Sequence, residues 1–208
     1  MKIILISVLV FLLSSMVDEN VLNAQNKTRI ELTCGPTLNG SVNLFRNWGN
    51  GIFAGGGFAY HLFTSFDLVM NVSYQDYPYK GHHLELISFG EKYYVTGKRS
   101  NIFETSLGFR TSPKGNRIFP SFAFRTGIIR VHTGEIIISH DWGDLIYHGT
   151  GSYDTKGFIA FDIGAGVSLA SRLRAIAEGR LTSSFDGKQT YVPLLLTVQY
   201  DLKKPSGS

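Results

Sequence analysis

The chain has 208 residues, which is enough for one domain. Its 23 glycines and 13% aromatic residues, beside only 17% charged residues, favour a β-rich fold with tight turns over a helical bundle. The formal net charge of +4 is not gathered into a basic patch, which argues against a nucleic-acid-binding protein.

The first 24 residues are typical of an export signal. Lys2 supplies a positive start, and the segment Ile3–Val17 is an apolar run that ends at an acidic pair. This run is shorter than the roughly 20 residues that a bilayer-spanning helix needs. Leu22–Ala24 provides a plausible cleavage site. We therefore predict a signal peptide over 1–24, with a retained membrane anchor as the alternative.

Eight later segments alternate apolar and polar side chains. In the first of them, Ile30 and Leu32 share one parity, while Arg29 and Glu31 share the other. Successive side chains of a strand point to opposite faces, so each segment predicts a strand with one apolar and one polar face. The segments are residues 29–44, 51–62, 65–77, 101–112, 118–130, 158–170, 173–185 and 190–202. Phe119 breaks the alternation by lying on the polar parity, and so does Ile129.

The connections between these segments alternate in length. Short turns with Gly, Pro, Asn or Ser chemistry lie at 61–64, 112–117 and 171–172. The other connections lie at 46–50, 77–100, 131–156 and 186–188, and two of them are long. Short turns at one rim and long loops at the other are typical of membrane barrels. The sequence predicts a closed eight-stranded antiparallel up-and-down transmembrane β-barrel over 25–202, followed by a short polar tail over 203–208.

The polar parity carries a nearly balanced set of charges, in which every base is an arginine. A closed eight-stranded barrel has room inside only for its own side chains, and charges buried there must be paired. Arginine is the base best suited to such pairing. We therefore predict a salt-bridged interior that does not conduct. Its members are Arg29, Glu31, Asp67, Glu104, Arg110, Arg125, Asp162, Arg174, Glu178 and Arg180, with Asp201 on the same parity.

A soluble exported barrel is the main alternative fold interpretation. It would hold the apolar face inside around a ligand, and would place the arginines and acids in water. Outward glycines, bases that are all arginine, and the single cysteine of the chain argue against it.

The long loops are the best candidates for contact with other molecules. Two hairpins are expected there, over 84–96 and 135–148. The aromatic candidates for contact are Tyr93, Tyr94, Trp142 and Tyr147. Exposed aromatic residues are typical of binding surfaces, but the same residues would also suit packing between the two hairpins.

No catalytic, cofactor or metal site is expected. Ser139, His140 and Asp141 are adjacent, and neighbours in an extended segment point apart, so they make no ready triad. The paired histidines at 82–83 have no acidic or cysteine partner at ligand spacing. We expect a protein that is not an enzyme, with a lipid-modifying enzyme at the barrel rim as the alternative.

The leader, the eight segments and the three short turns together resemble small bacterial outer-membrane barrels of the OmpA and OmpX type. The segments Phe161–Leu169 and Leu173–Arg180 look like the penultimate hairpin of the outer-membrane protein β-barrel domain family. The resemblance implies the bacterial outer membrane, contact with its lipids, and folding by the barrel-assembly machinery. One departure is that Tyr200 is followed by a polar tail, whereas such barrels usually end on an aromatic residue. The implied role is structural or interactive, with an extracellular ligand of the long loops left unidentified.

Overall fold

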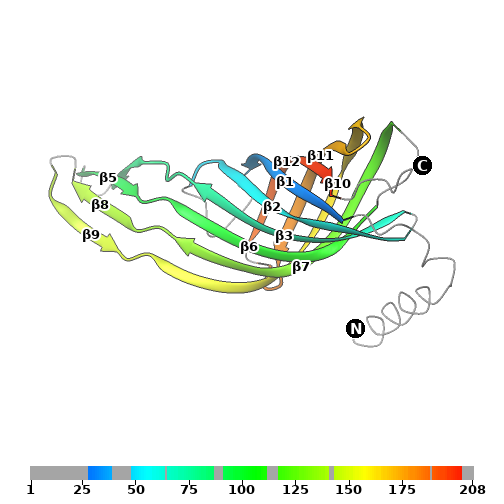
Figure 1. Ribbon diagram of the computed structural model, residues 1–208. Helices are drawn as coiled ribbons and strands as arrows, with labels where there is room; N and C mark the ends of the chain where they lie inside the picture. The colour runs from blue at the N-terminus through cyan, green and yellow to red at the C-terminus, as the bar shows by residue number, and fades with distance from the viewer. Residues whose placement is uncertain are drawn as a thin grey trace, which may run out of the picture.

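Eight strands form one closed antiparallel barrel (Figure 1). The computed structural model describes residues 28–38, 48–63, 65–86, 91–111, 117–140, 143–187 and 189–202. The barrel strands are β1 (Thr28–Leu38), β2 (Gly51–Phe63), β3 (Phe66–Tyr77), β6 (Ser100–Thr111), β7 (Ile118–Thr133), β10 (Ser152–Ala170), β11 (Leu173–Ser184) and β12 (Thr190–Asp201). Each strand pairs with its neighbours in the order β1-β12-β11-β10-β7-β6-β3-β2, and β2 returns to β1. The predicted closed, eight-stranded, antiparallel up-and-down fold is confirmed.

Two strands are longer than the sequence predicts. β7 continues past residue 130 to Thr133, and β10 begins at Ser152 rather than at residue 158. These extensions pair with each other, with Ser152 opposite Thr133, so their backbone groups are satisfied beyond the shorter barrel strands. The connection predicted over 131–156 is therefore largely strand.

Several predictions concern residues outside the described part of the chain. They are the signal peptide over 1–24, the end of the first strand beyond Leu38, and the polar tail over 203–208. Within the described residues, no helix has the length and apolar character needed to cross a bilayer.

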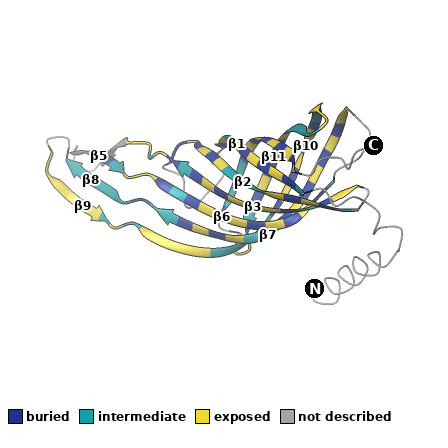
Figure 2. Cartoon of the chain, viewed as in Figure 1, coloured by how far each residue is buried: buried dark blue, intermediate teal, exposed yellow. Residues whose placement is uncertain are grey.

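The alternation of the sequence appears directly as alternating burial. Along β3, inward side chains are buried and outward ones are mostly exposed, and the same banding runs over the other barrel strands (Figure 2). Leu32, Ile52 and Ile163 are outward, with 65%, 70% and 64% of their surface exposed. Arginines and acids occupy the inner positions instead. The barrel is thus apolar outside and polar inside, which is the reverse of a soluble protein.

The long-loop rim carries a second, smaller sheet. It consists of β4 (His82–Leu86), β5 (Glu91–Gly97), β8 (Ile136–His140) and β9 (Leu145–Gly149). The two predicted hairpins both form, and β5 pairs with β8, so that they join into one sheet in the order β4-β5-β8-β9. We refer to these four strands as the loop sheet. It extends away from the barrel at the end opposite the short turns (Figure 1).

Candidate functional site

Inside the barrel near the short turns, one arginine joins two acids. Arg29 Nε donates to Asp201 Oδ1 at 2.7 Å, and Arg29 Nη1 donates to Asp67. His61 Nδ1 lies 2.7 Å from the other oxygen of Asp67. All four side chains are buried. The sequence analysis placed His61 both in the strand segment 51–62 and in the turn 61–64. The structure places it within β2, which continues to Phe63, and its ring is buried in the interior.

In the middle of the interior, Arg110 bridges two glutamates. It contacts Glu31 through Nη1, and its Nη2 donates to Glu178 Oε1 at 2.9 Å. Glu31 also accepts from Asn71 Nδ2 at 3.3 Å and from the amide of Gln199. Charged groups taken from water need both an opposite charge and hydrogen bonds, and this cluster supplies both.

A third cluster lies farther toward the loops. Asp162 accepts from Arg125 Nε at 2.7 Å and from Arg180 Nε at 2.8 Å. Arg180 Nη1 also donates to Glu104 at 3.1 Å, and the Tyr191 hydroxyl donates to the same carboxylate at 3.2 Å. Arg125 contacts Asn71, so the middle and upper clusters form one connected network. We call this set of buried ion pairs, from Arg29 to Glu104, the interior network.

Above the interior network, buried apolar side chains form a cluster inside the barrel. We call this group the apolar cap. Its buried members are Trp48, Tyr77, Ile102, Ile129, Val131, Phe158, Ala160 and Tyr191. Two links tie the cap to its surroundings: Trp48 packs edge-on against Tyr79 at 5.1 Å, and its Nε1 donates to the carbonyl of Lys98 at 3.2 Å. The sequence analysis missed the cap, although Ile129 had already stood out as an apolar residue on the polar parity.

Nine of the ten predicted interior charges are buried and belong to the interior network. The exception is Arg174, which is half-buried at the short-turn end and lies 5.6 Å over the ring of Phe119. Sequence reasoning missed the polar members that complete the network, namely His61, Asn71, Gln199 and Tyr191. The available signal was their inward parity. That parity does not predict which hydrogen-bond partner an uncharged side chain will have.

The structure describes three of the four aromatic candidates of the loops, and they differ in exposure. Tyr93 is half-buried and packs against the ring of His140 on the neighbouring hairpin at 4.9 Å. Tyr94 and Tyr147 are exposed, at 39% and 55%. Trp142 lies outside the described residues. Tyr93 therefore serves packing between the hairpins, while Tyr94 and Tyr147 are available to solvent.

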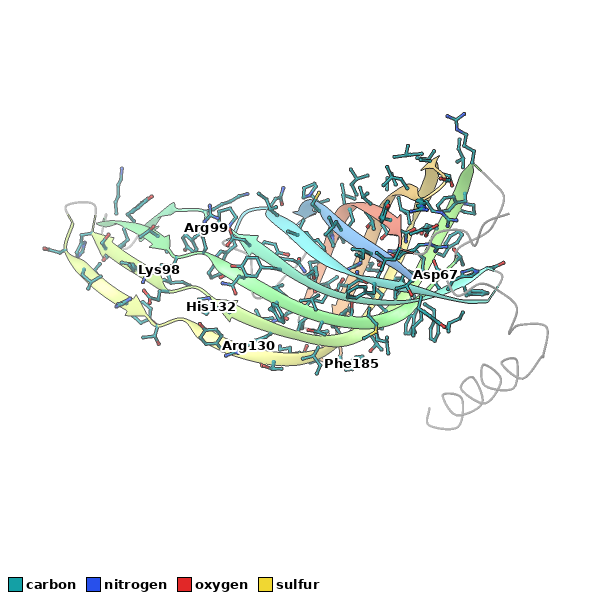
Figure 3. All side chains as sticks on the ribbon, viewed as in Figure 1. Asp67, Lys98, Arg99, Arg130, His132 and Phe185 are labelled. Carbon is teal, nitrogen blue, oxygen red and sulfur yellow. The ribbon has the colours of Figure 1, made fainter. Side chains whose placement is uncertain are left out.

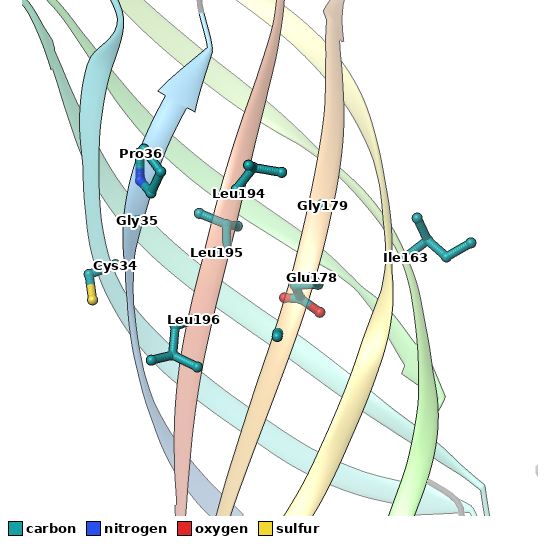
Figure 4. Close-up of a pocket in the computed structure, with 10 residues that line it drawn as sticks. Cys34, Gly35, Pro36, Ile163, Glu178, Gly179, Leu194, Leu195 and Leu196 are labelled. Carbon is teal, nitrogen blue, oxygen red and sulfur yellow. The ribbon is translucent and has the colours of Figure 1, made fainter.

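The described residues hold no cluster of three or more His, Cys, Asp or Glu side chains able to bind a metal. Ser139 and His140 are consecutive in β8, whereas Asp141 lies outside the described part. An outer hollow of the wall lies over β1, β12 and β11, where Gly35, Gly179 and Leu194 line it (Figure 4). This hollow is apolar, since Glu178 beneath it is buried and turned to the interior network.

Comparison with known proteins yields similarity of fold only. No family model matches the chain, and no curated protein sequence does. Three solved structures are similar over most of their length. They are Ail of Yersinia pestis in complex with the heparin analogue sucrose octasulfate (10% identity, TM-score 0.46, 85% of this chain and 97% of that chain), the N-terminal β-barrel domain of Pseudomonas aeruginosa OprF (14%, 0.47, 86% and 98%) and Neisserial surface protein A (15%, 0.46, 84% and 97%). In fold, the chain is similar to these small eight-stranded outer-membrane barrels.

Proposed function

We propose that this protein is an integral protein of the bacterial outer membrane, which crosses the bilayer as a closed barrel and presents the loop sheet outside the cell. The observation that carries the proposal is the inverted barrel. Apolar area left in water costs about 25 cal/mol per Å². A continuous wall of half-exposed Leu, Ile and Phe side chains is stable only where acyl chains replace water.

The limits of the apolar wall support the same placement. Tyr60, Phe66 and Tyr200 are exposed on the outside near the short turns, and Tyr74 and Phe185 are exposed near the long-loop rim. Aromatic residues favour the two membrane interfaces, where their rings meet both lipid and water. The bilayer then lies between these two groups, with the loop sheet beyond it.

The interior supports a barrel that is closed to solutes. The interior network occupies the half near the short turns, and the apolar cap, together with buried polar residues such as Gln75 and Gln189, occupies the half near the loops. A continuous water path would have to separate ion pairs that are fully buried and then pass the packed cap. The role that fits is structural or interactive, with the loop sheet as the contact surface and Tyr94 and Tyr147 as its exposed aromatic residues.

Export by the predicted signal peptide, and folding by the barrel-assembly machinery, form part of this proposal. We propose no catalytic role for Ser139 and His140, because they are consecutive in β8 and neighbours in a strand point to opposite faces. Unchanged lipid A in a strain that lacks the gene, measured by mass spectrometry, would remove the enzymatic alternative.

Cell fractionation with gel mobility tests the proposal. The protein should be found in the outer membrane and should migrate faster before boiling than after it, because the closed barrel resists detergent. A protein found in the soluble periplasm would overturn the proposal in favour of an exported ligand-binding barrel. In planar bilayers, the refolded protein should show no large steady current, and such a current would refute the closed interior.

A further inference from the structure

One patch on the outer surface, at the long-loop end of the apolar wall, combines apolar, basic and hydroxyl groups. It lies where β6, β7 and β10 pair, and the register places its outward residues in three rows. The lowest row holds Thr105, Ile128 and Gly157, the middle row Phe103, Arg130 and Thr155, and the highest row Asn101, His132 and Tyr153. Arg130, His132 and Phe185 lie along the same flank of the molecule (Figure 3). We call these rows the β7 patch.

Arg130 differs from the other bases near this rim. Its guanidinium lies 4.9 Å over the ring of Tyr153, and within the described residues it contacts no carboxylate. Three other bases near this rim are engaged by acids: Arg99 with Asp76, Lys98 with Glu135 at 2.8 Å, and Lys156 with Asp154 and Asp186 at 3.1 and 2.6 Å. Arg130 therefore presents an exposed positive charge that this part of the chain does not neutralise.

The groups around Arg130 are held in place. The ring of Tyr153 stacks on His132 at 4.5 Å, and His132 Nδ1 lies 3.3 Å from the amide nitrogen of Asn101. Thr155 lies directly opposite Arg130 in the register and is exposed. Arg130, His132, Tyr153 and Thr155 thus occupy adjacent outward positions of two paired strands, with the ring of Tyr153 in contact with both the guanidinium and the imidazole.

The lower edge of the β7 patch is apolar because a glycine makes room for a ring. A Cβ at Gly157 would lie 2.5 Å from the ring of Phe185, so only glycine lets that ring lie across the strand. Phe185 and Ile128 are exposed, at 67% and 58%, and Phe103 is exposed beside them. A lipid acyl chain placed here would continue along the apolar wall of the barrel.

We propose that the β7 patch binds the phosphate group of an outer-leaflet membrane lipid, with Arg130 as its main contact. This inference rests on the proposed membrane placement. Guanidinium groups match phosphate oxygens through parallel hydrogen bonds, and the Thr155 and Tyr153 hydroxyls can donate to the same anion. The lipid chains lie below, against Ile128 and Phe185. A soluble anion would contact only the polar groups around Arg130 and would leave Ile128 and Phe185 unused.

Native mass spectrometry of the full chain, refolded in a neutral detergent, tests this inference. Phosphatidic acid is compared with a diacylglycerol of the same chains, which lacks only the phosphate, and with inorganic phosphate. The chain should bind phosphatidic acid at least about tenfold more tightly than the diacylglycerol, as expected for hydrogen bonds to a charged group. Arg130→Gln should remove most of this preference, while Arg99→Gln, whose guanidinium is engaged by Asp76, should keep it.

Four results would overturn the inference: equal binding of the two lipids, an Arg130→Gln variant that binds like the parent, equal losses in both variants, or displacement of the lipid by an equal concentration of inorganic phosphate. Heat-modifiable mobility and insertion into phosphatidylcholine vesicles are measured on the same samples. A chain that inserts but shows no preference refutes only the phosphate site, whereas a chain that does not insert refutes the membrane proposal itself.

Discussion

The two halves of the barrel interior are packed with different chemistry. Near the short turns, four buried arginines face six buried acids, and each arginine touches at least one carboxylate. Near the loops, the largest buried group is a cluster of aromatic and aliphatic side chains. Each buried ion pair needs both of its members, because a buried charge without its partner is costly. The stability of an apolar cluster depends mainly on how well its side chains fill the available volume. The network half should therefore tolerate substitution far less than the cap half.

The largest effect is expected for Arg110→Met. The substitution leaves Glu31 and Glu178 buried without their shared base, which should lower the free energy of unfolding by about 3–5 kcal/mol. Urea unfolding of the vesicle-inserted protein, followed by tryptophan fluorescence, measures it. Arg99→Met is the matched control, since the Arg99–Asp76 pair is exposed and should contribute only about 0–1 kcal/mol. Equal losses in the two variants would contradict the importance of the interior network.

A second test concerns the wall behind the interior network. A Cβ at Gly164 would lie 2.0 Å from the carbonyl oxygen of Ala177 and 2.6 Å from the Cα of Glu178. Gly164→Ala should therefore move β10 away from β11 and cost about 1–3 kcal/mol in the same unfolding assay. Gly179→Ala is the control, because its Cβ would meet only a Leu194 methyl at 3.7 Å. A stable Gly164→Ala variant would mean that the two strands separate at little cost.

The apolar cap should respond more weakly. Ile129→Val removes one methyl group from the cap and should cost about 0.5–1.5 kcal/mol, through lost burial and the small cavity that remains. Ile128→Val is the neighbouring control on the outer face, where lipid fills the space, and its cost should be smaller. If Ile128→Val proved the more damaging variant, the assignment of inside and outside would be reversed.

The smallest effect is expected at the base of the loop sheet, where Glu135, just before β8, contacts Lys98, just after β5, and His148 of β9. Hydrogen bonds from these two side chains hold the pKa of the Glu135 carboxyl below its ordinary value of 4.5. A depressed pKa means that the contacts add stability above pH 4.5 and lose it as the pH falls through the lower folded value. Limited proteolysis should therefore cut the loop sheet somewhat faster at pH 3.5 than at pH 7. Glu135→Gln should remove this difference, and an unchanged difference in that variant would contradict the assignment.

Much of the barrel follows from the sequence because the period of a strand is local. Alternation of Ile30 and Leu32 with Arg29 and Glu31 determines which side chains share a face, whatever the partners. The balance of arginines and acids on the polar face predicts an interior filled by ion pairs. The same reasoning failed near the long-loop ends of the strands, where an apolar residue on the polar parity, such as Ile129, belongs to the cap.

Only the tertiary structure decided which groups meet. Arg29 and Asp201 are 172 residues apart, and they touch because β12 closes the ring against β1 in a particular register. Likewise, β5 pairs with β8, and that pairing turns two predicted hairpins into one sheet. A sequence fixes the face of each side chain through its own backbone, but the partner across the barrel depends on register and closure, which are properties of the whole chain.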